Sequence, residues 1–247
     1  MALALFDLDN TLLAGDSDYL WGGFLVRQGL VDGIRYEREN ERFYRAYREG
    51  CLDIHEFLNF SLRPLRDIPG AQLENLRQRF MREIIEPLLL PAAQALIDLH
   101  RSLGDTPVIV TATNAFVTAP IAERYAVAHL IATEPEVRDG AYTGKVMGVP
   151  CFQAGKVTRV LAWLEKTGET WAGSYFYSDS HNDLPLLEQV THPVVTDPDE
   201  TLAQVAERRN WPRLSLRQGT LAPDWARRLR ECSRVCNALP SDNTSIR

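Results

Sequence analysis

The feature that most constrains the fold is a series of short apolar runs separated by segments with helical spacing. Residues 92–103 place Leu96, Leu99 and Leu103 on one helical face, and residues 155–167 repeat this pattern with valine and leucine. Short apolar runs suit buried parallel strands, and here they occupy residues 3–8, 107–111, 174–178 and 193–196. Strands that alternate with helices pack into a parallel sheet covered on both faces. The sequence therefore predicts a doubly wound, Rossmann-like α/β fold.

The segment after the first apolar run has a different sequence pattern, because residues 16–87 contain no convincing strand. We expect helices there at 18–28, 34–49, 53–62 and 71–86, with Gly29 and Gly50 as stops. This segment is predicted to be a helical cap inserted after the first strand. The α/β core is then expected to comprise residues 1–15 and 88–222.

Two further segments lie outside this alternation of strands and helices. Residues 130–147 are predicted to form a β-hairpin, with Arg138-Asp139-Gly140 as its turn. Residues 223–247 form a C-terminal extension, whose polar end from about Leu239 is expected to fray.

Two aspartates directly after the first run carry the chemistry. In Asp7-Leu8-Asp9-Asn10-Thr11, alternation along an extended chain places Asp7 and Asp9 on the same side. Ligand sites of open α/β sheets lie at this carboxyl edge. Two such close carboxylates repel each other unless a cation or proton joins them, and Mg²⁺ prefers carboxylate and carbonyl oxygens. One carboxylate can then attack phosphorus while the other handles the proton of the leaving oxygen. For an isolated Asp-x-Asp, capping of the next helix would be the simpler explanation.

The aspartate pair is accompanied by matching groups after the other predicted strands. Thr111 is expected to end the second strand with a hydroxyl donor, and Lys156 to open a helix with a mobile cation. Ser178-Asp179-Ser180-His181-Asn182-Asp183 follows the third run and adds two more carboxylates. Each group alone has an ordinary explanation as a turn, surface or helix-terminal residue. Together they place the groups needed for phosphate chemistry at successive strand ends.

These motifs resemble the haloacid-dehalogenase superfamily of phosphohydrolases, in particular its phosphoserine-phosphatase-like branch with a helical cap, over residues 3–197. The resemblance implies that Asp7 is the nucleophile and becomes an aspartyl phosphate, and that Asp9 acts as general acid and then base. Thr111 and Lys156 would bind the phosphoryl group, with Asn182 at the substrate site and Asp183 in support. Mg²⁺ would be held by Asp7, the backbone carbonyl of Asp9, and Asp179. An acid at Asp9 favours the phosphatases of this family over the dehalogenases, which lack it.

The cap is expected to select the organic group of the substrate. Asp16 stands where phosphoserine phosphatases of this branch carry a Glu that meets the substrate amine, and Asp18 is close by. Alternatively, Ser17 caps a helix here and the acidic pair complements its dipole. The family's arginine for the serine carboxylate is missing, because Ser61 occupies its position and Arg63 is out of register.

These observations favour an amine-bearing phosphate such as histidinol phosphate, since some members of this branch are histidinol phosphatases. Tyr19, Trp21 and Tyr36 are candidate rings for stacking on an imidazole; alternatively, they belong to the apolar core. A phosphoserine phosphatase, a phosphotransferase of the same fold and a non-catalytic binding protein are the competing interpretations.

Composition restricts partners and location. The net charge of −6 argues against a nucleic-acid binder, which needs a basic face. The start of the chain lacks a basic n-region, and no apolar stretch approaches the ~20 residues needed to span a bilayer. We therefore expect a cytoplasmic enzyme that acts on a small phosphorylated metabolite, without membrane or nucleic-acid partners; the oligomeric state stays open. The cysteines at 51, 151, 232 and 236 lack the ligands of a zinc site and are expected to be reduced thiols.

Overall fold

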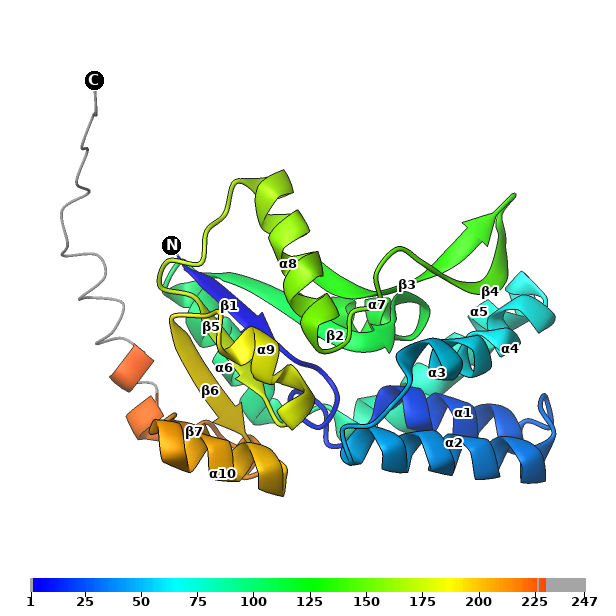
Figure 1. Cartoon of the computed structure of the whole chain (residues 1–247), viewed down its shortest axis with the longest axis horizontal. Coiled ribbons are helices and arrows are strands. Elements are labelled where there is room, and N and C mark those ends of the chain that lie inside the picture. Colours follow the sequence, from blue (N-terminus) through cyan, green and yellow to red (C-terminus); the bar gives the residue numbers. More distant parts are fainter. Residues whose placement is uncertain (1, 226, 230–247) are drawn as a thin grey trace.

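A mainly parallel sheet lies at the centre of the computed structural model, which describes residues 2–225 and 227–229 (Figure 1). Within these residues the sheet has seven strands in the order β4-β3-β2-β1-β5-β6-β7. The strands are β1 (Leu3–Phe6), β2 (Thr106–Asn114), β3 (His129–Arg138), β4 (Ala141–Met147), β5 (Tyr175–Ser178), β6 (His192–Thr196) and β7 (Arg213–Leu214). The β3–β4 pair is antiparallel and the other neighbours are parallel. The polypeptide thus winds outward from β1 in both directions.

Successive side chains of β1 pack alternately into two separate apolar clusters, one on each face of the sheet. Ala4 and Phe6 pack into one cluster, while Leu3 and Leu5 pack into the other. Helices α6 (Pro91–Ser102) and α7 (Ala115–Arg124) contribute to the first cluster. Helices α8 (Ala154–Thr167), α9 (Leu184–Leu187) and α10 (Glu200–Arg209) contribute to the second. Each fully buried Leu or Phe side chain stabilises the fold by about 1.5–3 kcal/mol. The predicted doubly wound α/β fold is confirmed.

The segment between β1 and β2 is helical, and its first three helices begin and end within one residue of the predicted bounds. Its elements are α1 (Ser17–Arg27), α2 (Gly33–Arg48), α3 (Ile54–Ser61), α4 (Arg63–Asp67), α5 (Gly70–Phe80), the π-helix η1 (Met81–Ile85) and the 3₁₀ turn η2 (Glu86–Leu88). Asp16, Asp32 and Asp53 cap the first three helices through their carboxylates. Gly29 and Gly50 follow α1 and α2 with φ of +67° and +72°, a conformation that favours glycine. The helix expected over 71–86 instead ends at Phe80 and continues as the π-helix.

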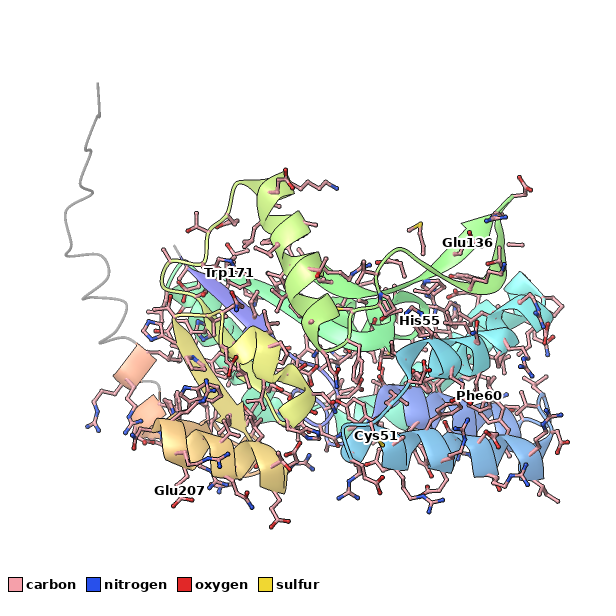
Figure 2. The ribbon with its side chains drawn as sticks, viewed as in Figure 1. Cys51, His55, Phe60, Glu136, Trp171 and Glu207 are labelled. Carbon is pink, nitrogen blue, oxygen red and sulfur yellow. The ribbon has the colours of Figure 1, made fainter. Side chains whose placement is uncertain are left out.

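The cap, residues 16–87, shares its apolar core with the sheet domain. Trp21 packs against Phe80 of the cap and against Phe116 of α7, with ring centroids 5.2 and 5.7 Å apart. Phe60 lies between cap helices (Figure 2), where its ring approaches those of Tyr36 and Phe43 at 4.4 and 5.2 Å. The cap is therefore fixed to the core by packing and not only by the two connecting segments. Its division from the core as a domain stays a prediction.

The predicted hairpin is present as β3 and β4, and it extends toward α4 and α5 of the cap (Figure 1). Asp139 and Gly140 form its turn with positive φ values of 51° and 77°. Beyond β7, Trp225 and Leu229 are buried in the apolar cluster that includes β1. The expected fraying from Leu239, and the pair Cys232 and Cys236, lie outside the described residues. In the part of the chain that the structure covers, no helix is both long enough and apolar enough to cross a membrane.

Candidate active site

The predicted site residues gather at the carboxyl ends of β1, β2 and β5, the three central strands. Register places Phe6 opposite Ile109 of β2 and Tyr177 of β5, so the residues that follow these positions meet at one edge. Asp7 and Thr111 are buried there and line a common cavity. Thr111 does not end its strand as predicted, because β2 continues to Asn114. The β2–β3 register is irregular between Val110 and Asn114, so Thr111 lies where the strand departs from regular pairing.

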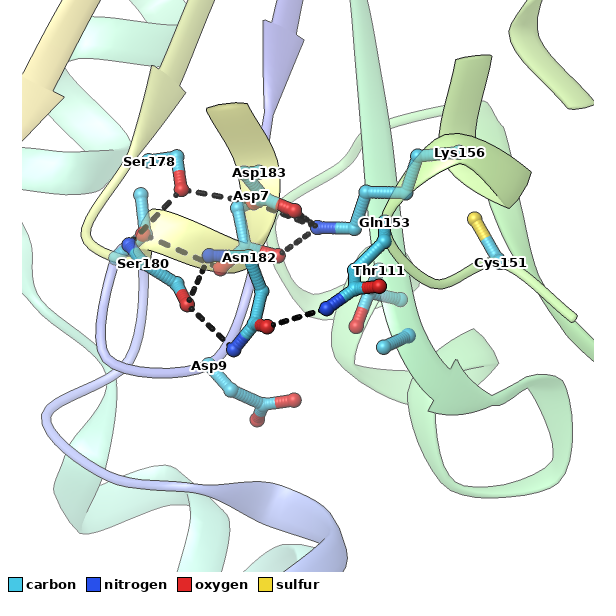
Figure 3. A network of polar contacts seen from close by, with 12 residues as sticks. Asp7, Asp9, Thr111, Cys151, Gln153, Lys156, Ser178, Ser180, Asn182 and Asp183 are labelled. Carbon is cyan, nitrogen blue, oxygen red and sulfur yellow. Dashed lines mark hydrogen bonds and ion pairs between the residues drawn. The ribbon is translucent and has the colours of Figure 1, made fainter. Parts of the chain in front are cut away.

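Lys156 is a buried cation placed by a constrained turn at the start of α8. Gln153 precedes the helix with φ of 48°, an unfavourable backbone conformation for a side chain other than glycine. At Gly155 a Cβ atom would lie 2.1 Å from the Pro150 carbonyl oxygen, so this position accepts only glycine without backbone movement. From this turn Lys156 Nζ donates to Asp7 and Asp183, each at 2.7 Å (Figure 3). This turn therefore places Lys156 next to Asp7, the proposed nucleophile. Lys156 is the residue that the sequence predicted to bind the phosphoryl group.

The charge balance around Asp7 is unfavourable despite this lysine. Burial raises the pKa of Asp7 to about 7, while Lys156 lowers it and the neighbouring Asp183 raises it again. Burial also disfavours the Lys156 ammonium, but Asp183 and Asp7 hold its pKa above the ordinary value. Ser178 donates to Asp183 at 2.7 Å and shares in fixing this supporting carboxylate. The lysine therefore stays charged and keeps Asp7 oriented.

Asp179 adds a further acid to this buried group. Thr11 Oγ1 lies 3.3 Å from Asp7 Oδ2 and 3.1 Å from Asp179 Oδ1, and it accepts a hydrogen bond from the Asp179 backbone N–H at 3.1 Å. Burial, followed by repulsion from Asp7 and Asp183, raises the pKa of Asp179 well above its ordinary value. Two carboxylates that share one hydroxyl neighbour would be stabilised by a divalent cation.

The residues at this position fit Mg²⁺ in the chemistry of their donors. Among the described residues, no group of three or more His, Cys, Asp or Glu side chains is arranged to hold a metal ion. Mg²⁺ is usually bound by one or two carboxylates together with waters and substrate phosphate oxygens. Asp7 and Asp179 are such a pair, and the Asp9 carbonyl follows in the same loop. The donor set is thus one that would be completed by phosphate and water oxygens.

Asp9 is held separately from Asp7 by donors from two elements. Its carboxylate accepts from the Ser17 backbone N–H of α1 at 2.6 Å and from the Thr113 hydroxyl of β2 at 2.7 Å. Burial, with repulsion from Asp16, raises the pKa of Asp9 to about 6, although Ser17 and Thr113 act in the opposite direction. A carboxyl with such a pKa can exchange a proton near neutral pH, as a general acid and base must.

Above these aspartates the cap and the sheet edge line a partly open cavity of about 60 Å³. Asp16 and Asp18 both line it, and burial raises the pKa of each carboxyl. The alternative prediction, that Ser17 caps the helix, is wrong: Asp16 is the N-cap residue and accepts from the Tyr19 N–H at 2.9 Å. Asp16 therefore both caps α1 and lines the cavity, and its contact with a substrate amine stays a prediction.

Aromatic side chains form much of the cavity wall, but they are mostly not those considered from the sequence. Tyr19 does line it, whereas Trp21 is buried in the apolar core and Tyr36 faces a separate groove of the cap. The other rings in the wall are Phe43, Tyr44, Tyr47, Phe57 and Phe152. Whether a ring on α2 or α3 lines the cavity depends on which face of the helix lies toward the sheet edge. The periodicity of the sequence alone does not give this orientation. Within the described residues no Lys, Arg or His side chain lines this cavity.

Asn182 joins the core to the cap. Its Nδ2 donates to the backbone carbonyl of Tyr47, at the end of α2, at 2.9 Å, and its Oδ1 accepts from Gln153 at 2.9 Å (Figure 3). Beside it, His181 is fixed by Asp199 at 2.8 Å and packs against Gly50, where a Cβ atom would lie 2.7 Å from Nε2. The loop after β5 therefore contacts the cap directly. The assignment of Asn182 to the substrate site stays a prediction.

The fold and this constellation of acids, hydroxyls and a buried lysine define a class of phosphate-processing enzymes. Residues 4–188 match the model of the haloacid dehalogenase-like hydrolases, and the chain belongs to that family. It is a phosphatase, since its relatives include a histidinol-phosphatase and a phosphoserine phosphatase and its fold is that of phosphoserine phosphatases.

The relatives have the following similarity. A histidinol-phosphatase of Neisseria meningitidis is 42% identical over 219 residues, covering 87% of this chain and 99% of the relative. The phosphoserine phosphatase SerB1 of Mycobacterium tuberculosis is 29% identical, covering 85% and 69%. Among solved structures, a protein of unknown function from Bordetella pertussis Tohama I has a TM-score of 0.82 and 45% identity, covering 87% and 98%. A substrate-bound phosphoserine phosphatase has a TM-score of 0.66 at 18% identity, covering 95% and 97%, and supports the fold alone.

Proposed function

We propose that this phosphatase hydrolyses a small phosphomonoester through an aspartyl-phosphate intermediate on Asp7. A carboxylate oxygen of Asp7 attacks phosphorus, the ester P–O bond breaks, and the Asp9 carboxyl gives its proton to the leaving alkoxide. Asp9 then takes a proton from water, whose oxygen attacks the phosphorus, and the Asp7 carboxylate leaves. Support comes from Lys156, which lies 2.7 Å from Asp7, and from the raised pKa of Asp9.

Mg²⁺ is the proposed cofactor, held by Asp7, the Asp9 carbonyl and Asp179. When bound it would neutralise charge on the phosphoryl oxygens and on the adjacent carboxylates. Thr111 and Lys156 would then bind the phosphoryl group, and Asn182 would complete the substrate site from the loop that also contacts the cap. The buried excess of carboxylates over lysine at this point supports the assignment.

The proposed substrate class is an amine-bearing phosphate without a carboxylate, with histidinol phosphate as the best candidate. The observation that carries this proposal is the cavity wall, where Asp16 and Asp18 lie among aromatic rings without a basic side chain in the described residues. An ammonium would pair with these acids, and an imidazole would pack on the rings. A substrate carboxylate would face the acids without an arginine, since Ser61 and Arg63 do not line the cavity. The name of the Neisseria relative agrees with this choice.

The proposal is tested by comparing kcat/KM for histidinol phosphate and phosphoserine. A charged hydrogen bond contributes about 1.5–3 kcal/mol, which corresponds to discrimination of roughly tenfold or more. Asp16→Asn keeps an N-cap oxygen but removes the charge, so it should reduce kcat/KM for histidinol phosphate by about tenfold or more. It should change kcat/KM for 4-nitrophenyl phosphate little, because this leaving group needs no proton from Asp9, whose pKa Asp16 also raises. Asp32→Asn is the matched control, because Asp32 caps α2 but lines a different groove. Faster turnover of phosphoserine, or an equal loss on 4-nitrophenyl phosphate, would refute the substrate assignment.

A further inference from the structure

Tyr47, in the last turn of α2, is a cap residue that contacts both the cavity and the core loops. It lines the cavity together with Asp7 and Asp9. Its ring faces that of Phe152, in the loop before α8, at a centroid distance of 6.0 Å. Its backbone carbonyl accepts the Asn182 hydrogen bond of 2.9 Å. The tyrosine is therefore fixed at its backbone and at its ring by two different core loops.

The phenol hydroxyl is affected by the charges of the acidic site residues. Burial raises the pKa of Tyr47 well above its ordinary value, as do Asp179, Asp7 and Asp183, so the hydroxyl keeps its proton. The Ser180 side chain acts on this pKa in the opposite direction, which places its hydroxyl near that of Tyr47. The Ser180 oxygen already accepts from the Asn182 N–H at 3.2 Å and from its Nδ2 at 3.3 Å, so its own proton is the one available to Tyr47. With Ser180 as the donor, the phenol proton is left for a further acceptor.

A phosphoryl group on Asp7 would supply that acceptor, because its non-bridging oxygens would lie in the cavity that Tyr47 lines. We propose that the Tyr47 hydroxyl donates a hydrogen bond to the transferring phosphoryl group, so that the cap contributes a catalytic donor as well as substrate specificity. This inference rests on the proposed attack by Asp7. Tyr47 keeps its proton throughout, and its hydrogen bond strengthens as charge develops on the phosphoryl oxygens.

Tyr47→Phe tests this inference with 4-nitrophenyl phosphate, a substrate without an amine. Loss of a donor to a charged group should lower kcat by about 10- to 100-fold, with little change in KM. Inhibition by vanadate, which adopts the geometry of the transition state, should weaken by a similar factor. Tyr36→Phe is the control: Tyr36 is also on α2 and buried, but it does not line the cavity, so both quantities should keep wild-type values.

The outcomes separate this inference from the proposed function. If Tyr47→Phe has wild-type kcat and vanadate affinity while Asp7→Asn is inactive, the donor role of Tyr47 is refuted and the nucleophile stands. If Asp7→Asn turns over the substrate at the wild-type rate, the proposed function is refuted, and the role of Tyr47 with it. A loss of kcat in Tyr47→Phe with unchanged vanadate affinity also contradicts the inference, because a transition-state contact must affect both.

Discussion

In the proposed mechanism two carboxylates of the site have opposite tasks, and their neighbours differ accordingly. Asp7 must attack as an anion, and it accepts a hydrogen bond from the charged Lys156 at 2.7 Å. Asp9 must carry a proton at one stage, and its carboxyl accepts from the neutral donors Ser17 and Thr113. Burial raises the pKa values of Asp7 and Asp9, to about 7 and about 6. Asp7 has a cation beside it and Asp9 has neutral donors. This difference in neighbours suits Asp7 to the role of nucleophile and Asp9 to the role of acid.

Asp9→Asn tests the acid role through the leaving group. Removal of a general acid typically costs about 10²–10⁴-fold in rate. The loss should be large for an alkyl phosphate, whose alkoxide needs a proton, and much smaller for 4-nitrophenyl phosphate in the phosphorylation step. Rapid-quench single-turnover measurements on both substrates give the comparison, with wild type as the reference. Equal losses on the two substrates would argue against proton donation by Asp9.

At this scale the sequence predicted the acids and the lysine better than the groups that hold them. Asp7, Thr111 and Lys156 are adjacent in space because strand ends of a parallel sheet converge. Thr113, which binds Asp9, was missed although it follows Thr111 by two residues, the spacing of one face of a strand. The sequence left open whether Trp21 is a pocket ring or a core residue, because an aromatic residue on a cap helix can face either; it lies in the core.

At the scale of elements, the end of α2 is the point where the cap contacts the catalytic loop. Gly50→Ala would place a Cβ 2.7 Å from His181 and would also strain a backbone with φ of +72°. The left-handed conformation alone costs an alanine about 1–2 kcal/mol. The contact with His181 should in addition shift α2 away from its position over the site. If this shift removes about 1.4 kcal/mol of the binding free energy that the cap provides, kcat/KM falls by about tenfold.

Gly29→Ala is the matched control for this prediction. Gly29 follows α1 with φ of +67°, but a Cβ there would meet nothing within 4 Å. Both variants should lose the stability that the strained backbone costs, Gly50→Ala more because of the contact with His181, and only Gly50→Ala should lose kcat/KM. If the two variants have the same kcat/KM, the contact between Gly50 and His181 has no role in the active cap position.

Elements with clear signals were predicted and elements with mixed signals were not. The helices capped by Asp16, Asp32 and Asp53 and stopped by glycine agree with their predicted bounds within about two residues. Helix α7 was missed: it follows β2 directly and contains Pro120, which usually argues against a helix. Strand β7 has two residues, too few for a pattern, and depends on pairing with β6.

At the scale of the whole molecule, the net charge is −6 and the proposed substrate is an anion, so a bound cation is needed to offset their repulsion at the site. Chelation should abolish turnover, and Mg²⁺ should restore it. Because Asp7 and Asp179 repel each other when no cation lies between them, Mg²⁺ at ~100 times its Kd should stabilise the fold by about 2.7 kcal/mol, or roughly 5–11 °C in Tm. Differential scanning fluorimetry measures this shift, and Asp179→Asn should reduce it. Full activity after exhaustive chelation would contradict the metal assignment.

The position of the cap over the sheet edge also bears on the kind of molecule that can carry its phosphate to Asp7. The cavity is lined by α1, α2 and α3 on one side and by the sheet edge on the other. A phosphorylated side chain on a folded protein would bring its surrounding surface against these helices, which would hold its phosphorus away from Asp7. A free metabolite has no such surface. We therefore expect phosphorylated proteins to be poor substrates and free metabolites to be better ones.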